Sequence, residues 1–146
     1  EGTPDQAARA ICDYLHREMN YVSGSTSVHT PARDAWQAKS GVCQDFAHLA
    51  IGALRHIGIP ARYVSGYLHP HIEAGVGETV RGESPAWVEW WTGDWFGFDP
   101  TNDKEVAEHH VVVARAREYR DVPPLSGVFG GTTSTMGVEV LVTLLA

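Results

Sequence analysis

Hydrophobic positions recur with two different periods along the chain, and the period changes near residue 60. Before that point apolar residues are three or four positions apart, as in the stripe of Ile11, Leu15 and Met19, which is the spacing of one helix face. After it, segments such as 61–68 (ARYVSGYL) and 109–116 (HHVVVARA) have the composition and alternation of strands. Helices followed by strands predict an α+β fold with N-terminal helices packed on an antiparallel sheet.

The predicted helices have residues at their ends that favour helix starts and stops. These are Thr3, Pro4 and Gln6 at the start of the first, Thr30, Pro31 and Gly41 around the second, and Gly58 and Pro60 after the third, which begins near Cys43.

Residues 85–102 (PAWVEWWTGDWFGFDPTN) predict a hairpin whose turn is TGD. A glycine-rich segment (73–84) precedes this hairpin and predicts a loop. A long segment rich in proline and glycine (119–135) leads to a last predicted strand over 137–145.

Composition places the chain among ordinary folded domains. Its 146 residues predict one domain. Because the chain begins directly at a predicted helix start and without Met, we expect an N-terminal domain upstream in a longer chain. The net charge of −7 opposes binding to nucleic acid or to anionic membranes. Two cysteines outside any zinc-ligand spacing are consistent with a reducing, cytoplasmic location, and no motif predicts a cofactor.

Cys43 lies at the start of the most apolar predicted helix, and two interpretations fit it. A free cysteine in such a stripe is usually a small core residue. A helix start also offers unpaired N–H groups and the positive end of the helix dipole, which favour a thiolate and a developing oxyanion. Cys12, in the middle of the first predicted helix, has neither feature and is interpreted as packing.

Asp99 ends the second strand of the predicted hairpin, just before Pro100. It is either a turn former or a carboxylate that orients a base. If the turn centres near residues 92–93, position 85 lies on the same face as Asp99, opposite or diagonal to it. A histidine oriented by Asp99 would therefore stand at position 85, where this chain has proline.

The stretches GVCQDFAHLAIGALRHIGIPARYVSGYL, AWVEWW and GFDPTN, in this order, resemble the core of the transglutaminase-like superfamily, and EYRDVPPLSGVFGG resembles its bacterial branch. The resemblance implies a papain-like fold with a Cys-His-Asp triad acting on peptide or protein amides. It places the nucleophile at Cys43, the acid at Asp99 and the histidine at position 85. Gln44 and Trp87 are expected to line the cleft.

The departure from the family is Pro85, because proline has no group that accepts a proton from a thiol. Two hypotheses from different classes follow. The chain is a cysteine amidase, peptidase or acyltransferase that works through a thioester with an impaired or substituted base, or it is a silent relative kept as a binding or structural module. His69 and His71 are the substitute bases that the sequence offers, since they lie in the segment leading to the hairpin. His109 and His110 are less favoured, and His48 is expected to point away on a polar helix face.

Two further patterns have ordinary explanations. The HPH of residues 69–71 looks like half of a metal site, but no further ligands are evident, so we expect no metal. The cluster of tryptophan and phenylalanine on the hairpin could form a ligand platform, although core packing is the commoner cause.

Overall fold

The computed structural model describes residues 2–69, 75–82, 85–123 and 139–145, together with 127, 130, 131 and 135. Helices α1 (Pro4–Glu18), α2 (Ala32–Ala38) and α3 (Cys43–His56) come first in the chain. Strands β3 (Ala61–Leu68), β5 (Ala86–Trp91), β6 (Trp95–Asp99), β7 (Lys104–Glu105) and β8 (His110–Ala116) then form a five-stranded sheet in the order β7-β6-β5-β3-β8, with every pair antiparallel. The α+β prediction is confirmed.

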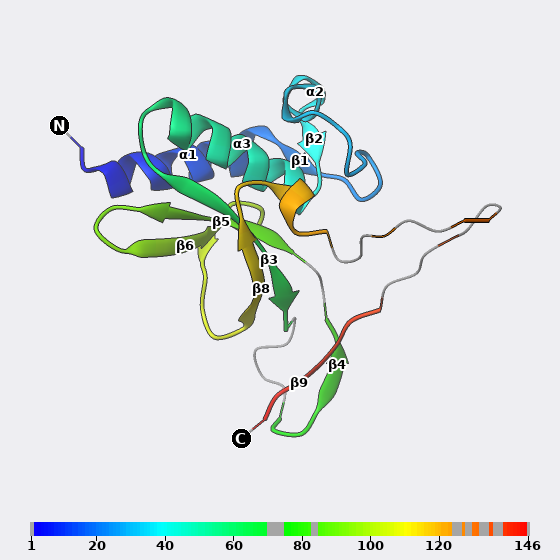
Figure 1. The fold of residues 1–146 in the computed structure, drawn as a ribbon. Coiled ribbons are helices and arrows are strands. Elements are labelled where there is room, and N and C mark those ends of the chain that lie inside the picture. The colour runs from blue at the N-terminus through cyan, green and yellow to red at the C-terminus, as the bar shows by residue number, and fades with distance from the viewer. Residues whose placement is uncertain are drawn as a thin grey trace.

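Shorter elements complete the fold. Strands β1 (Asn20–Tyr21) and β2 (Ser40–Gly41) pair in parallel beside the helices, and the 3-10 helix η1 (Tyr119–Asp121) follows β8. Strands β4 (Thr79–Arg81) and β9 (Leu141–Thr143) form a separate antiparallel ribbon, which projects away from the helices (Figure 1). Within the described residues, no helix is both long enough and apolar enough to cross a membrane.

The helices cover one face of the five-stranded sheet, with α1 and α3 side by side (Figure 1). The core fills the space between them. On the strands it is built by alternate residues such as Ala86, Val88 and Trp90, which are 4%, 0% and 0% exposed. Burying side chains of this size stabilises the fold by about 1.5–3 kcal/mol each, so this layer fixes how α3 sits on β5.

The predicted start of α1 is confirmed. The Gln6 backbone N–H donates to the Thr3 hydroxyl at 3.2 Å, and the Thr3 N–H donates to the Gln6 side chain at 2.9 Å. The end of α3 also agrees, because Gly58 takes the left-handed φ of +84° that stops a helix. Cys12 is fully buried in the core, which agrees with its interpretation as a packing residue.

Three predicted boundaries were wrong. The second helix begins after Pro31 and ends at Ala38, because Lys39 adopts a left-handed conformation with φ of 52° and residues 40–41 join a strand pair. The glycine-rich loop contains strand β4 over Thr79–Arg81, which pairs only with residues 141–143 near the other end of the chain. The last strand is shorter than predicted, and part of its predicted range lies outside the described residues.

Candidate active site

Cys43 is the first residue of α3 and is half-buried. Its position is fixed by Asp45 in the same turn, whose Oδ2 accepts the N–H of Val42 at 2.8 Å and the hydroxyl of Thr26 at 2.5 Å. Asp45 is only 1% exposed, so this carboxylate ties the preceding loop to the helix start from inside. A helix start held in this way presents Cys43 in a defined orientation.

The surroundings of Cys43 favour the thiol over the thiolate. Burial raises the pKa of Cys43, and the negative charges of Asp99 and Asp45 raise it further. The backbone N–H groups of Ala86 and Gln44 act in the opposite direction but do not outweigh burial, so the pKa stays above the ordinary thiol value. These interactions show that the N-terminus of α3 lies against the start of β5, and that the charge of Asp99 is near enough to raise the pKa of the Cys43 thiol.

Pro85 lies immediately before the residue whose N–H faces Cys43. It is buried, and its carbonyl accepts the N–H of Gly66 at 3.3 Å, which extends the pairing of β3 with β5. The hairpin register pairs Val88 with Phe98 and Trp91 with Trp95, as the sequence predicted. Continued by three residues, this register sets position 85 opposite residue 101 and diagonal to Asp99.

Asp99 is completely buried at the end of β6. Its Oδ1 accepts the N–H groups of Thr101 at 3.0 Å and Asn102 at 3.1 Å, and its Oδ2 accepts the Asn102 side-chain amide at 2.7 Å. The turn-forming interpretation of Asp99 is therefore correct. Burial raises its pKa, but the neighbouring His110 and the hydrogen bonds from Asn102 outweigh this, and the net pKa is lowered.

His110 is the imidazole that Asp99 faces in this structure. Its Nε2 lies 3.5 Å from Asp99 Oδ2, its Nδ1 accepts the N–H of Ala107 at 3.2 Å, and its side chain is 3% exposed. From the sequence, His110 is less favoured as a substitute base than His69 and His71. The alternation along β8 could have identified it as inward-facing, because His110 shares its phase with Val112, Ala114 and Ala116, which are all less exposed than their neighbours.

Aromatic rings pack beside α3 near Cys43. Tyr63 is 2% exposed, and burial and then the nearby Cys43 raise its pKa. Its ring lies 5.2 Å from that of His48 and 6.3 Å from that of Tyr119. His48 is half-buried, because its Nε2 accepts the Tyr119 N–H at 3.3 Å and it packs against the η1 segment.

The two expected cleft residues are both buried. Gln44 is 8% exposed, and its side-chain amide donates to the carbonyl of Val28 at 3.4 Å, which ties the loop before α2 to the helix start. Trp87 has no exposed surface and packs edge-on against His110, with ring centroids 5.3 Å apart. The side chain of Trp87 thus supports the back of the sheet and presents no open face to a ligand.

The structure places His69 away from the thiol. Ser65 pairs with Ala86 beside Cys43, and His69 follows four residues later, about 13 Å further along the chain at the usual strand rise. It lies with His109 in a cavity of about 260 Å³ against β9, with neither ring nitrogen bonded. This separation is too long for direct proton transfer to Cys43. His71 lies outside the described residues. In the described part of the chain, no three His, Cys, Asp or Glu side chains come close enough to hold a metal ion.

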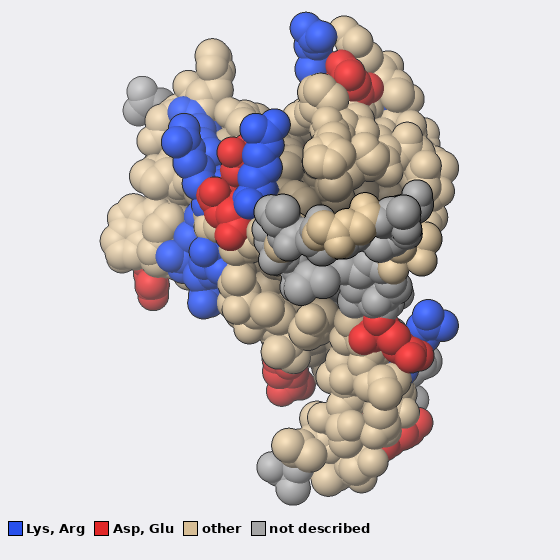
Figure 2. Space-filling model, turned by 45° about the vertical axis from the view of Figure 1, so that its right-hand side comes forward, with Lys and Arg blue, Asp and Glu red and all other residues tan. Residues whose placement is uncertain are grey.

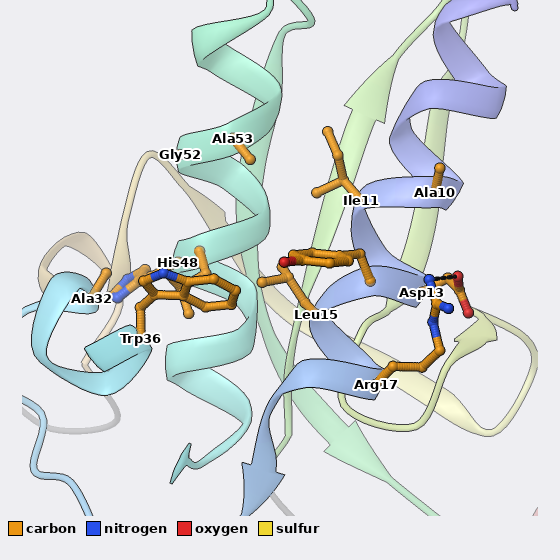
Figure 3. Close-up of a pocket in the computed structure, with 12 residues that line it drawn as sticks. Ala10, Ile11, Asp13, Leu15, Arg17, Ala32, Trp36, His48, Gly52 and Ala53 are labelled. Atoms are coloured by element: carbon orange, nitrogen blue, oxygen red, sulfur yellow. Dashed lines mark ion pairs between the residues drawn. The ribbon is translucent and has the colours of Figure 1, made fainter. Parts of the chain in front are cut away.

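A larger groove of about 700 Å³ runs between α1, α2 and α3 (Figure 3). Its walls are mostly apolar, with Ile11 and Leu15 on one side and Trp36 on the other, and the Asp13–Arg17 ion pair lies at its edge. Cys43 and Asp99 are not among its lining residues. The groove is therefore distinct from the site around the thiol.

Comparison with known proteins places this geometry in a family. The family model of the transglutaminase-like superfamily matches residues 1–100. The uncharacterised protein ML0607 of Mycobacterium leprae is 47% identical over 144 residues, which cover 98% of this chain and 52% of that protein. The uncharacterised protein Rv2569c of Mycobacterium tuberculosis is 38% identical, covering 94% of this chain and 46% of that one.

The fold has a counterpart among solved structures as well. A protein from Cytophaga hutchinsonii named "Putative Cysteine Protease" superposes with a TM-score of 0.75 and 32% identity, over 94% of this chain and 44% of that one. The chain thus spans about half the length of the mycobacterial relatives that it matches. The match over residues 1–100, together with this shared fold, shows that the chain belongs to the transglutaminase-like superfamily.

Proposed function

We propose that the chain is a transglutaminase-like thiol acyl-transfer domain that attacks peptide-like amides with Cys43 and, lacking a histidine at position 85, turns over slowly at neutral pH. The observation that carries this is the position of the thiol. Cys43 begins α3, receives N–H groups from Ala86 and Gln44, and lies within electrostatic reach of Asp99. A core cysteine would not need this arrangement.

In the reaction the Cys43 thiolate attacks the amide carbonyl carbon, and backbone N–H groups at the helix start stabilise the resulting oxyanion. The carbon–nitrogen bond then breaks, the amine leaves with a proton, and a thioester remains. Water or a second amine attacks the thioester and regenerates the thiol. Pro85 supplies no proton to the leaving amine, so in this chain that proton comes from solvent.

A second candidate is a silent domain that retains the cleft for binding. The raised pKa of Cys43 and the lack of a base at Pro85 favour it, because the thiol then stays protonated near pH 7. A thiol still depends less on its base than a hydroxyl does, since a small thiolate fraction exists at neutral pH. The two candidates differ in whether a restored base gives turnover.

The test is Pro85→His, assayed with glutamine-containing peptides for release of ammonia and for incorporation of a primary amine. Loss of a base within a triad costs several orders of magnitude, so we expect turnover to rise by at least about 100-fold. Pro85→His combined with Cys43→Ala is the matched control and should stay inactive. A folded Pro85→His chain without turnover and without faster Cys43 alkylation would reject the acyl-transfer assignment in favour of the silent domain.

A further inference from the structure

A polar groove of about 300 Å³ lies beside α3, next to the Tyr63–His48–Tyr119 cluster. It is bounded by the loop 28–32, by α3 between His48 and Arg55, and by residues 117–120. Gln44, the residue after Cys43, donates to the carbonyl of Val28 in the groove wall, and Tyr119 donates to His48. The groove therefore adjoins the helix start that carries Cys43.

The groove carries an excess of positive charge. Arg55, Arg117 and Arg120 line it, with Glu118 as the acidic side chain among its walls. None of the ion pairs within the described residues involves these three arginines. Figure 2 shows Lys and Arg side chains in one area of this face, with Asp and Glu side chains between them. In a chain of net charge −7, a positive groove is a local reversal that favours an anionic ligand.

Arg55 is tied to the segment that carries Arg117 by a bond to a neutral acceptor, and Glu118 is the acidic side chain that acts on its charge. The Arg55 guanidinium donates to the carbonyl of Ala61 at 2.9 Å and to the carbonyl of Arg117 at 2.9 Å, and these acceptors are neutral. Burial and then the charge of Arg117 lower the pKa of Arg55. A carboxylate bound between the arginines would relieve this repulsion, and guanidinium groups bind carboxylates with two hydrogen bonds.

The distance from Cys43 sets where such a carboxylate would lie on a substrate. Along α3 the groove begins at His48, about 7.5 Å from Cys43, and reaches Arg55, about 18 Å away, at 1.5 Å per residue. An extended peptide advances about 3.3 Å per residue. An acidic side chain about two to five residues from the attacked amide would reach the arginines.

We propose that this groove binds the carboxylate of an acidic residue on the substrate, so that the domain selects acidic peptides. This inference depends on the proposed function for the amide attack, while the carboxylate binding itself can be measured separately. Arg117 and Arg120 are the specificity-determining residues, because both are exposed and neither is part of the thiol site.

The test uses the Cys43→Ala chain, which cannot form a thioester, and fluorescein-labelled peptides with a central glutamine. One set carries a single glutamate two to five residues away on either side, and the matched set carries glutamine there. We expect at least one glutamate peptide to bind about tenfold more tightly than its glutamine partner. Arg117→Gln with Arg120→Gln should remove this preference, and Arg17→Gln, which changes an exposed arginine on α1, should keep it.

Equal binding of the two sets, no measurable binding of any glutamate peptide, or equal weakening by Arg17→Gln would overturn the inference. Inorganic phosphate that binds through Arg117 and Arg120 without any peptide preference would overturn it too, because the groove would then be a free-anion site. Turnover by Pro85→His is read independently. A glutamate preference with no turnover supports carboxylate binding in the groove and rejects the acyl-transfer assignment. Turnover without a glutamate preference supports acyl transfer and rejects carboxylate binding in the groove.

Discussion

Asp99 Oδ2 and His110 Nε2 lie 3.5 Å apart, and their side chains are 0% and 3% exposed. His110 Nδ1 accepts a backbone N–H from Ala107, so the neutral ring carries its proton on Nε2, toward the carboxylate. The buried ring thus lies between the Asp99 carboxylate and the backbone of Ala107, where it helps to fix the position of Asp99.

Asp99→Asn should destabilise the fold by about 1–3 kcal/mol, because the hydrogen bonds made by a buried carboxylate are only partly replaced by an amide. The pKa of Asp99 is lowered from 3.8, so its charged form is favoured by folding. That stability is present above about pH 4 and is lost as the pH falls through the folded-state pKa. Urea unfolding from pH 7 to pH 2 measures both effects.

Asp94→Asn is the matched control, because Asp94 is exposed in the hairpin turn and bonds only the neighbouring Trp95 N–H. It should leave the free energy of unfolding within about 0.5 kcal/mol of the parent chain. If Asp99→Asn shows the same acid-induced loss of stability as the parent, the lowered pKa of Asp99 is contradicted.

Alkylation of Cys43 by iodoacetamide should be slow at pH 7.5, and its rate should still be rising with pH above pH 9. Burial and the nearby carboxylates raise the pKa of Cys43 above its ordinary 9.0, and only the thiolate reacts. Mass spectrometry follows the modified peptide across pH 6–10. Cys43→Ala identifies the background from Cys12, and rapid labelling of Cys43 at pH 7.5 would point to a base that the described residues do not show.

The parts of the site that follow from short-range patterns were predictable. The helix start at Cys43 and the register that relates position 85 to Asp99 depend on apolar spacing and on one tight turn. Both appear in the structure as expected. Pro85 could be placed for the same reason.

Long-range neighbours could not be predicted in this way. His110 reaches Asp99 only because β8 pairs with β3 on the far side of β5, and β4 pairs with residues some 60 positions later, for instance Thr79 with Thr143. Such pairings depend on how the whole sheet closes. The contact of His48 with Tyr119 could not be predicted for a related reason, since the segment that covers His48 comes from after β8.

Gly66→Ala should destabilise the chain by about 1–3 kcal/mol or more. A Cβ at this position would lie 2.2 Å from the Trp87 ring and 2.4 Å from the Val111 carbonyl, so a buried ring and a strand would both have to move. Gly52→Ala is the matched control, because α3 leaves open space there. It should stabilise the chain by about 0.5–1 kcal/mol. Thermal unfolding of the two variants should therefore shift in opposite directions.

Cys12→Ala should make the fold more resistant to alkali than the parent while costing stability at pH 7. Burial, followed by the charges of Asp103 and Asp99, raises the pKa of Cys12 from 9.0 to about 12. A thiol whose folded-state pKa is raised stabilises the fold fully below pH 9 and loses that contribution as the pH rises toward 12. At pH 7 the lost sulfur leaves a small cavity in a core position that is 0% exposed, which costs about 1 kcal/mol. Urea unfolding at pH 7, 9 and 10.5 should show that the difference in unfolding free energy between parent and variant becomes smaller as the pH rises. A difference that stays constant would mean that Cys12 ionises as readily in the folded chain as in the unfolded one.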